Sequence, residues 1–189
     1  MNPTVIDPEK IREIRLYNII DMGLTFSAMM RLYDQGTKGK LRARMITTAK
    51  EVFEARSQEE FRRKHSEFCQ WGTKGILLAR KNCLASYGQV AKTLDVVLKV
   101  AVYYCHLPEC EKSKQLSRWL NGAVDRKMMV MLKKHYRKAI EPWPRAIEQV
   151  DGPNYAKIQE IVRKFIRDEH QDSIVPVQFD DYYWQKLNR

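Results

Sequence analysis

Residues 86–107 read SYGQVAKTLDVVLKVAVYYCHL and contain the most apolar run of the chain. Ser86, followed three residues later by Gln89, matches the capping box with which many helices begin. The apolar residues continue almost to Pro108, which ends the pattern because proline cannot continue a helix. We therefore expect a central helix over about residues 87–106, with the other elements packed around it.

Apolar residues recur at helical spacing in six further segments. These segments are residues 9–33, 41–56, 58–71, 109–120, 124–139 and 155–170. No pair of alternating segments joined by a hairpin turn is found. The expected fold is all-α, a single-domain bundle of about seven or eight helices around the central apolar helix. We expect residues 1–172 to form this domain, and residues 173–189 to form an acidic, aromatic tail packed on it.

The composition is that of a soluble, basic protein. A chain of 189 residues with 44% hydrophobic and 30% charged residues is long enough to bury one proper core. The net charge is +11, and the basic residues concentrate between positions 61 and 140, whereas the end of the chain is acidic. Such a field favours polyanionic partners such as DNA or RNA. The alternative is an ordinary soluble protein with scattered lysines.

Nothing at the start of the chain resembles a signal or transit peptide. The one long apolar run carries Lys92, Asp95 and Lys99, so we expect no membrane span and no membrane partner. The four cysteines are expected to be free thiols in a reducing, cytoplasmic setting.

Two short segments of the sequence are similar. Residues 36–44 (GTKGKLRAR) and 72–80 (GTKGILLAR) match at seven of nine positions. One hypothesis is a pair of Gly-Thr-Lys-Gly loops at helix entries, where backbone N–H groups and the helix N-terminus would attract phosphate. The alternative is that both segments are helix ends followed by turns, which is the commoner use of glycine.

The expected central helix carries a polar stripe. Its members are Gln89, Lys92, Asp95, Lys99, Tyr103 and His106. The stripe could edge a pocket with shifted pKa values around Lys92, Asp95 and Lys99, or it could be the solvated face of a core helix with helix-spaced ion pairs. We favour the solvated face.

Known catalytic motifs are absent, and we predict no catalytic residues and no cofactor. Cys105, His106 and Cys110 form a single cluster, whereas structural zinc sites usually show two ligand pairs, so we predict no metal.

Basic residues surround both Gly-Thr-Lys-Gly segments and line the 124–139 helix. The predicted phosphate-binding residues are Lys38, Lys40, Arg42, Arg44, Lys74, Arg80, Lys81, Arg126, Lys127, Lys133, Lys134, Arg137 and Lys138. Together they predict a non-enzymatic nucleic-acid-binding protein that grips the phosphate backbone with little readout of base sequence.

Two other functions remain open. The tail could present Phe179, Tyr182, Tyr183 and Trp184 to a protein partner, which would make the chain an adaptor. The protein could also be a nuclease or another small helical enzyme that uses the stripe around Asp95.

Overall fold

The computed structural model describes residues 7–26, 32–79 and 83–188. Within these residues there are eight α-helices and no strands, which confirms the predicted all-α class. The helices are α1 (Pro8–Phe26), α2 (Gln35–Phe53), α3 (Gln58–Gly75), α4 (Tyr87–Leu98), α5 (Cys110–Trp119), α6 (Arg126–His135), α7 (Gly152–His170) and α8 (Pro176–Asn188). A π-helical turn, η2 (Lys99–Tyr104), extends α4, and two 3-10 turns, η3 (Arg137–Ala139) and η4 (Ile147–Gln149), precede α7.

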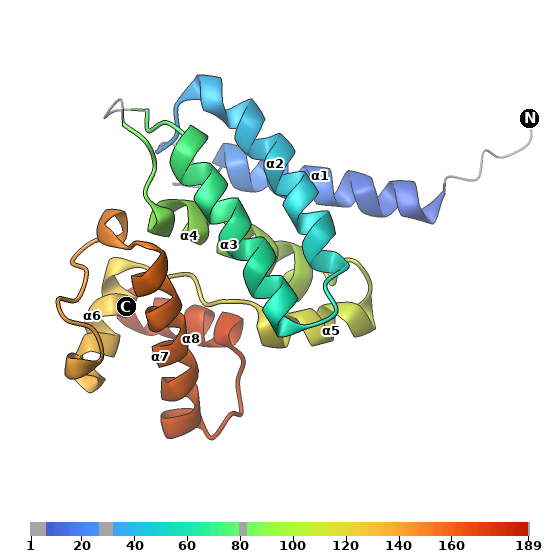
Figure 1. The fold of residues 1–189 in the computed structure, drawn as a ribbon. Helices are drawn as coiled ribbons and strands as arrows, with labels where there is room; N and C mark the ends of the chain where they lie inside the picture. Colours follow the sequence, from blue (N-terminus) through green and yellow to red (C-terminus); the bar gives the residue numbers. More distant parts are fainter. Residues whose placement is uncertain (1–6, 27–31, 80–82, 189) are drawn as a thin grey trace, which may run out of the picture.

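Helix α4 lies at the centre of the bundle. In the view of Figure 1, α1, α2 and α3 form the upper half and α6, α7 and α8 the lower half. Helix α4 packs against α1 and α3 of the upper half and against α7 of the lower half. Val90, Leu94 and Leu98 are fully buried there, so α4 supplies core side chains to the contact between the halves.

The start of α4 has the predicted capping box. The Ser86 side chain accepts a hydrogen bond from the Gln89 N–H, and the Gln89 side chain accepts one from the Ser86 N–H. Two of the unpaired N–H groups at the start of the helix are satisfied in this way.

The two Gly-Thr-Lys-Gly segments are helical, which corrects their prediction as loops. The first is the opening turn of α2, where the Asp34 carboxylate accepts a hydrogen bond from the Gly36 N–H at 2.8 Å. The second is the last turn of α3. A Cβ on Gly72 would lie 2.5 Å from Cγ1 of Val90, so this glycine lets α3 approach α4 closely. The two similar segments therefore occupy opposite helix ends.

Residues 176–188 of the segment predicted as an acidic tail form helix α8, which packs on α6 and α7. Phe179 is fully buried and contacts the ring of Phe165 in α7, at 5.6 Å between ring centroids. On the other side, Lys99 of η2 bonds Asp180 at 2.5 Å and Asp181 at 2.9 Å. Apolar packing and these ion pairs hold α8 against the rest of the bundle.

Candidate functional site

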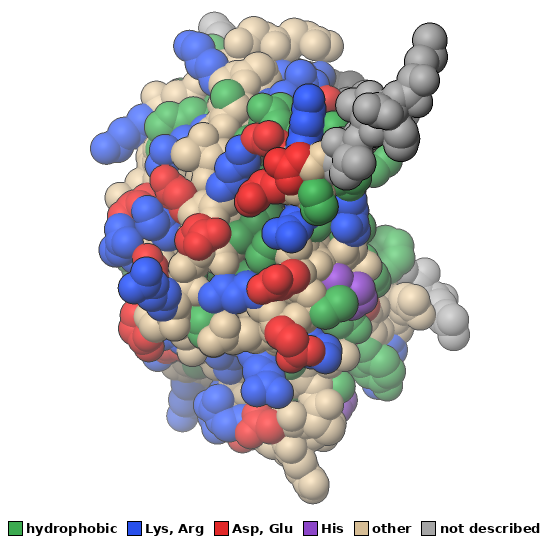
Figure 2. Space-filling model, turned by 90° about the vertical axis from the view of Figure 1, so that its right-hand side faces the viewer, with side chains coloured by type: hydrophobic (Ala, Val, Ile, Leu, Met, Phe, Trp, Pro, Cys, Tyr) green, Lys and Arg blue, Asp and Glu red, His purple; other side chains and the backbone are tan. Residues whose placement is uncertain are grey.

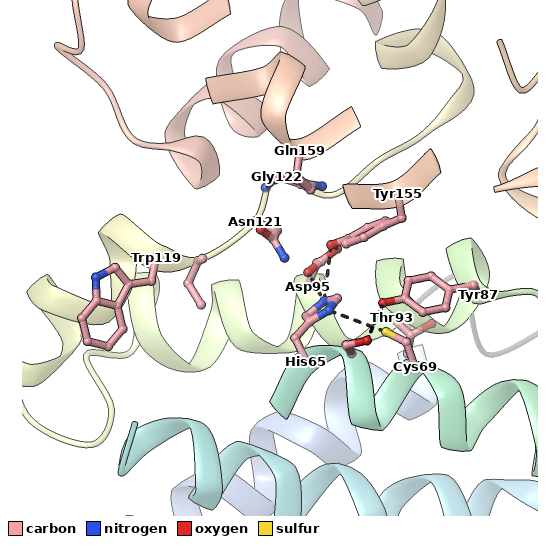
Figure 3. A network of polar contacts seen from close by, with 12 residues as sticks. His65, Cys69, Tyr87, Thr93, Asp95, Trp119, Asn121, Gly122, Tyr155 and Gln159 are labelled. Atoms are coloured by element: carbon pink, nitrogen blue, oxygen red, sulfur yellow. Dashed lines mark hydrogen bonds and ion pairs between the residues drawn. The ribbon is translucent and has the colours of Figure 1, made fainter. Parts of the chain in front are cut away.

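Side chains from three helices meet below the surface where α3, α4 and α7 come together (Figure 3). Asp95 of α4 is only 3% exposed, and its two carboxylate oxygens have different partners. Oδ1 lies 2.9 Å from Nε2 of His65 in α3, and Oδ2 accepts a hydrogen bond from the Tyr155 hydroxyl of α7 at 2.6 Å. The His65 and Tyr155 rings are stacked, with 5.3 Å between centroids. The buried charge thereby links the two halves of the bundle.

Cys69 completes this set, which we call the Asp95 network: Cys69, His65, Asp95 and Tyr155. It lies one turn beyond His65 on α3, and its Sγ is 3.7 Å from Nδ1 of His65. Burial alone would lower the pKa of His65, but charge interactions and hydrogen bonds with Cys69 and Asp95 outweigh it and raise that pKa to about 10. His65 is therefore an imidazolium at neutral pH, and its charge balances that of Asp95.

The Asp95 network resembles a nucleophile–base–acid set in composition, but its polar groups are engaged with one another. Both ring nitrogens of His65 already contact partners in the network, so neither is positioned to take a proton from a bound molecule. Cys69 is fully buried, so its sulfur is not accessible for attack. The arrangement can hold a charge in a defined place, and it fits a supporting role better than a catalytic one.

The predicted solvated stripe on the central helix is wrong at two of its charged positions. Asp95 is buried, and it pairs with His65 rather than with Lys92 or Lys99 at helical spacing. Lys99 is mostly buried and pairs with Asp180 and Asp181 of α8. Asp95 of α4 therefore contacts α3 and α7, and Lys99 of η2 contacts α8, in each case through a polar side chain.

A pocket of about 350 Å³ lies beside the Asp95 network, between α3 and α7. His65 and Tyr155 contribute to its lining, together with Arg62 of α3 and Arg163 of α7. Sequence reasoning missed this pocket because its residues are up to a hundred positions apart. The one available signal was His65, a polar residue on the apolar face that includes Phe61 and Phe68.

The first group of predicted phosphate-binding residues lies at one end of the α2–α3 pair. The Asp34 N–H donates to the Leu77 carbonyl at 2.9 Å, so the start of α2 and the end of α3 come together. Lys38, Lys40 and Lys74 lie near these ends. Arg42 is paired with Asp21, and Arg44 is partly buried, while Arg80 and Lys81 lie outside the described residues.

Helix α6 and the η3 turn carry the second group. Asp125 caps α6 by accepting a hydrogen bond from the Met128 N–H at 2.8 Å, and the apolar face of α6 is buried against α7 and α8. The basic residues of this segment are all exposed: Arg126, Lys127, Lys133, Lys134, Arg137 and Lys138. We call these six residues the α6 basic surface. Figure 1 places α6 at the lower left and the start of α2 at the top, so the two predicted groups do not share one continuous surface.

The four predicted partner-binding aromatics divide into two pairs. Phe179 and Tyr183 face the core, where they contact each other at 4.7 Å between ring centroids. Tyr182 is 54% exposed and Trp184 58% exposed. Of the four predicted anchors, only Tyr182 and Trp184 have most of their surface available to a partner.

Charges of both signs are interspersed on the face shown in Figure 2. Elsewhere on the helices, ion pairs such as Lys64 with Glu51 join neighbouring elements. A larger pocket, of about 590 Å³, lies among α1, α2 and α3 and is lined by more acidic than basic residues. Neither the face in Figure 2 nor this larger pocket is predominantly positive, so neither is a candidate for gripping a nucleic-acid backbone.

Comparisons with protein-family models, with curated proteins and with solved structures find no match for this chain. Across the described residues, no helix has both the length and the apolar character that crossing a membrane would require. In the same part of the chain, no three His, Cys, Asp or Glu side chains are grouped so that they could hold a metal ion.

Proposed function

We propose that the protein binds nucleic acid through the phosphate backbone, using the α6 basic surface. The observation that carries this proposal is the set of cations on α6 and η3 that lack acidic partners. Apart from Lys127, none of the six residues forms an ion pair with any residue in the described part of the chain. Cations without partners are the ones that can replace the counterions of a nucleic acid.

The neighbourhood of α6 supports the same proposal. Within residues 125–139 the only acidic residue is Asp125, which caps α6, and the apolar side of α6 is anchored by Met128, Met131 and Leu132. The basic side chains therefore stand on a fixed helix, which presents them without a large cost in backbone ordering. Phosphate contacts of this kind carry no sequence information by themselves, so we expect weak discrimination between sequences.

The experiment measures binding of labelled single-stranded and double-stranded DNA and RNA by fluorescence anisotropy at low salt. The test variant carries Lys133→Glu, Lys134→Glu and Lys138→Glu. The control variant carries Lys10→Glu, Lys114→Glu and Lys157→Glu, which changes the net charge equally at exposed positions on α1, α5 and α7. The proposal predicts a large loss of affinity in the test variant only. Absence of binding to all four nucleic acids, or an equal loss in both variants, would refute it.

A protein–protein adaptor is the second candidate, and the exposure of Tyr182 and Trp184 favours it. The double substitution Tyr182→Ser and Trp184→Ser tests this function without disturbing the buried Phe179 and Tyr183. Loss of a co-purifying protein on this substitution, with nucleic-acid binding unchanged, would support the adaptor function. Unchanged association would count against it.

A further inference from the structure

The pocket between α3 and α7 has two walls and a connecting side chain. Arg62, Ser66 and Gln70 form the α3 wall, and the first half of α7 forms the other. Tyr87 of α4 reaches both: its hydroxyl donates to Oγ of Ser66 at 3.5 Å, and its ring lies 3.3 Å from where a Cβ on Gly152 would stand. The pocket is thus built from helices that the Asp95 network also holds together.

Arg163 is fixed in this pocket without a carboxylate partner. Its Nη2 donates to the carbonyl of Trp119 at 3.0 Å, to that of Leu120 at 3.3 Å and to Oδ1 of Asn121 at 3.2 Å. All three acceptors are neutral, so they position the guanidinium but leave its charge uncompensated. Only one of its nitrogens makes these contacts, and a guanidinium has five N–H donors in total.

The charged side chains that line the pocket around Arg163 give it a net positive charge. Arg62 lines the same pocket and forms no ion pair with any described residue. Glu160 also lines it, but Lys157 pairs with that carboxylate at 3.4 Å. Burial, followed by the charge of Arg62, lowers the pKa of Arg163 to about 10. Two guanidinium groups therefore share one pocket, and the charge of Arg62 disfavours that of Arg163.

The Asp95 network supplies only part of the missing negative charge. Asp95 and Tyr155 act to raise the pKa of Arg163, but burial and the charge of Arg62 outweigh them, and Asp95 is itself paired with His65. The first turn of α7 is capped by Asp151, whose carboxylate accepts a hydrogen bond from the Asn154 N–H at 2.8 Å, so the two guanidinium groups alone supply the positive charge of the site. An anion bound here would offset both guanidinium charges.

We propose that this pocket binds a small phosphate monoester, with the phosphate between Arg62 and Arg163. The planar fork of donors on each guanidinium matches two oxygens of a phosphate, and the charge of the pair matches a dianion. Ser66 and Gln70 add a hydroxyl and an amide along the α3 wall. A volume of about 350 Å³ is at the small end of ligand pockets, so the ligand is the size of a sugar phosphate or a single nucleotide.

This pocket is separate from the α6 basic surface, so the two proposals can fail independently. None of the six residues of that surface lines the pocket. Loss of phosphate binding with oligonucleotide binding intact would therefore concern the pocket alone.

The test is isothermal titration of the full chain with inorganic phosphate, with a nucleoside 5′-monophosphate and with succinate as a dicarboxylate of similar charge. We expect both phosphates to bind. The substitution Arg62→Gln should weaken them about tenfold or more, the effect of losing a charged hydrogen bond. Arg63→Gln is the matched control, because Arg63 is the next residue of α3 and is paired with Glu67 outside the pocket. This control should bind as the wild type does.

Arg163→Lys is the second variant. It keeps the positive charge but loses the planar pair of N–H donors, so it should also bind both phosphates more weakly. Tighter binding of the nucleotide than of inorganic phosphate would show that the pocket also contacts the nucleoside. Equal binding of the two would show that it reads the phosphate alone. The proposal is overturned if neither phosphate binds, if succinate binds as tightly as phosphate, or if Arg62→Gln binds as the wild type does.

Discussion

Asp95 is the single residue on which the junction of the two halves depends most. Its carboxylate is buried and relies on His65 and Tyr155 for compensation. We expect Asp95→Asn to lower the free energy of unfolding by about 3–5 kcal/mol, because it leaves the buried imidazolium of His65 without a counter-charge. Urea denaturation followed by circular dichroism measures this change.

Tyr155→Phe is the matched comparison for Asp95→Asn. It removes only the hydroxyl that donates to Asp95 and keeps the ring that stacks on His65. Its cost should be smaller, about 1.5–3 kcal/mol, as for one hydrogen bond to a charged group. Equal small effects of the two substitutions would show that the His65–Asp95 pair is not charged in the folded protein.

The raised pKa of His65 makes stability depend on pH. The folded state holds the proton until about pH 10, whereas an unfolded histidine releases it near its ordinary pKa of 6.5. The stabilisation is therefore fully present below pH 6.5 and is lost as the pH rises towards 10. Between these values the free energy of unfolding should fall by up to about 1.4 kcal/mol per pH unit.

Urea denaturation at a series of pH values measures this dependence, and His65→Gln is the control. Other groups also titrate near pH 10, so the comparison uses the difference between the wild type and the variant. That difference should shrink steadily from pH 7 to pH 10. A constant difference would contradict the assignment of the raised pKa to His65.

At the scale of elements, the α3–α4 contact depends on Gly72. We expect Gly72→Ala to destabilise the protein by about 1–3 kcal/mol, because the added Cβ would lie 2.5 Å from Val90 and would push the helices apart. Gly39→Ala is the control in the similar segment, since it meets no atom within 4 Å there. Alanine should stabilise α2 by about 0.5–1 kcal/mol. Thermal unfolding should thus show shifts of opposite sign, and equal shifts would contradict this account.

The sequence predicted a helix boundary correctly where a capping motif was recognised. The Ser86–Gln89 box gave the start of α4 correctly because its hydrogen bonds are made within four residues. The start of α2 was missed because Gly36 and Gly39 suggested a loop, whereas the Asp34 cap allowed a helix. Helix α6 ends at His135, before the predicted end at residue 139, and the chain continues as η3.

At the scale of the whole molecule, the site was harder to predict than the fold. The helical period and the absence of strand patterns were enough for the all-α class. The charge map indicated α6 but could not show that the start of α2 lies at another end of the bundle. The pairing of Asp95 with His65 and Tyr155 joins residues 30 and 60 positions apart. Such contacts depend on tertiary packing, which no local pattern in a single sequence contains.

The salt dependence of oligonucleotide binding tests the central proposal most directly. The logarithm of the binding constant should fall with the logarithm of the salt concentration, with a slope of about −0.9 for each phosphate that is neutralised on duplex DNA. For the wild type we expect a slope of about −4 or steeper, and for the Lys133, Lys134 and Lys138 variant a slope that is shallower by about 2 to 3. The Lys10, Lys114 and Lys157 control should keep the wild-type slope. A slope that is the same in all three proteins, or a wild type that does not bind, would contradict nucleic-acid binding through α6.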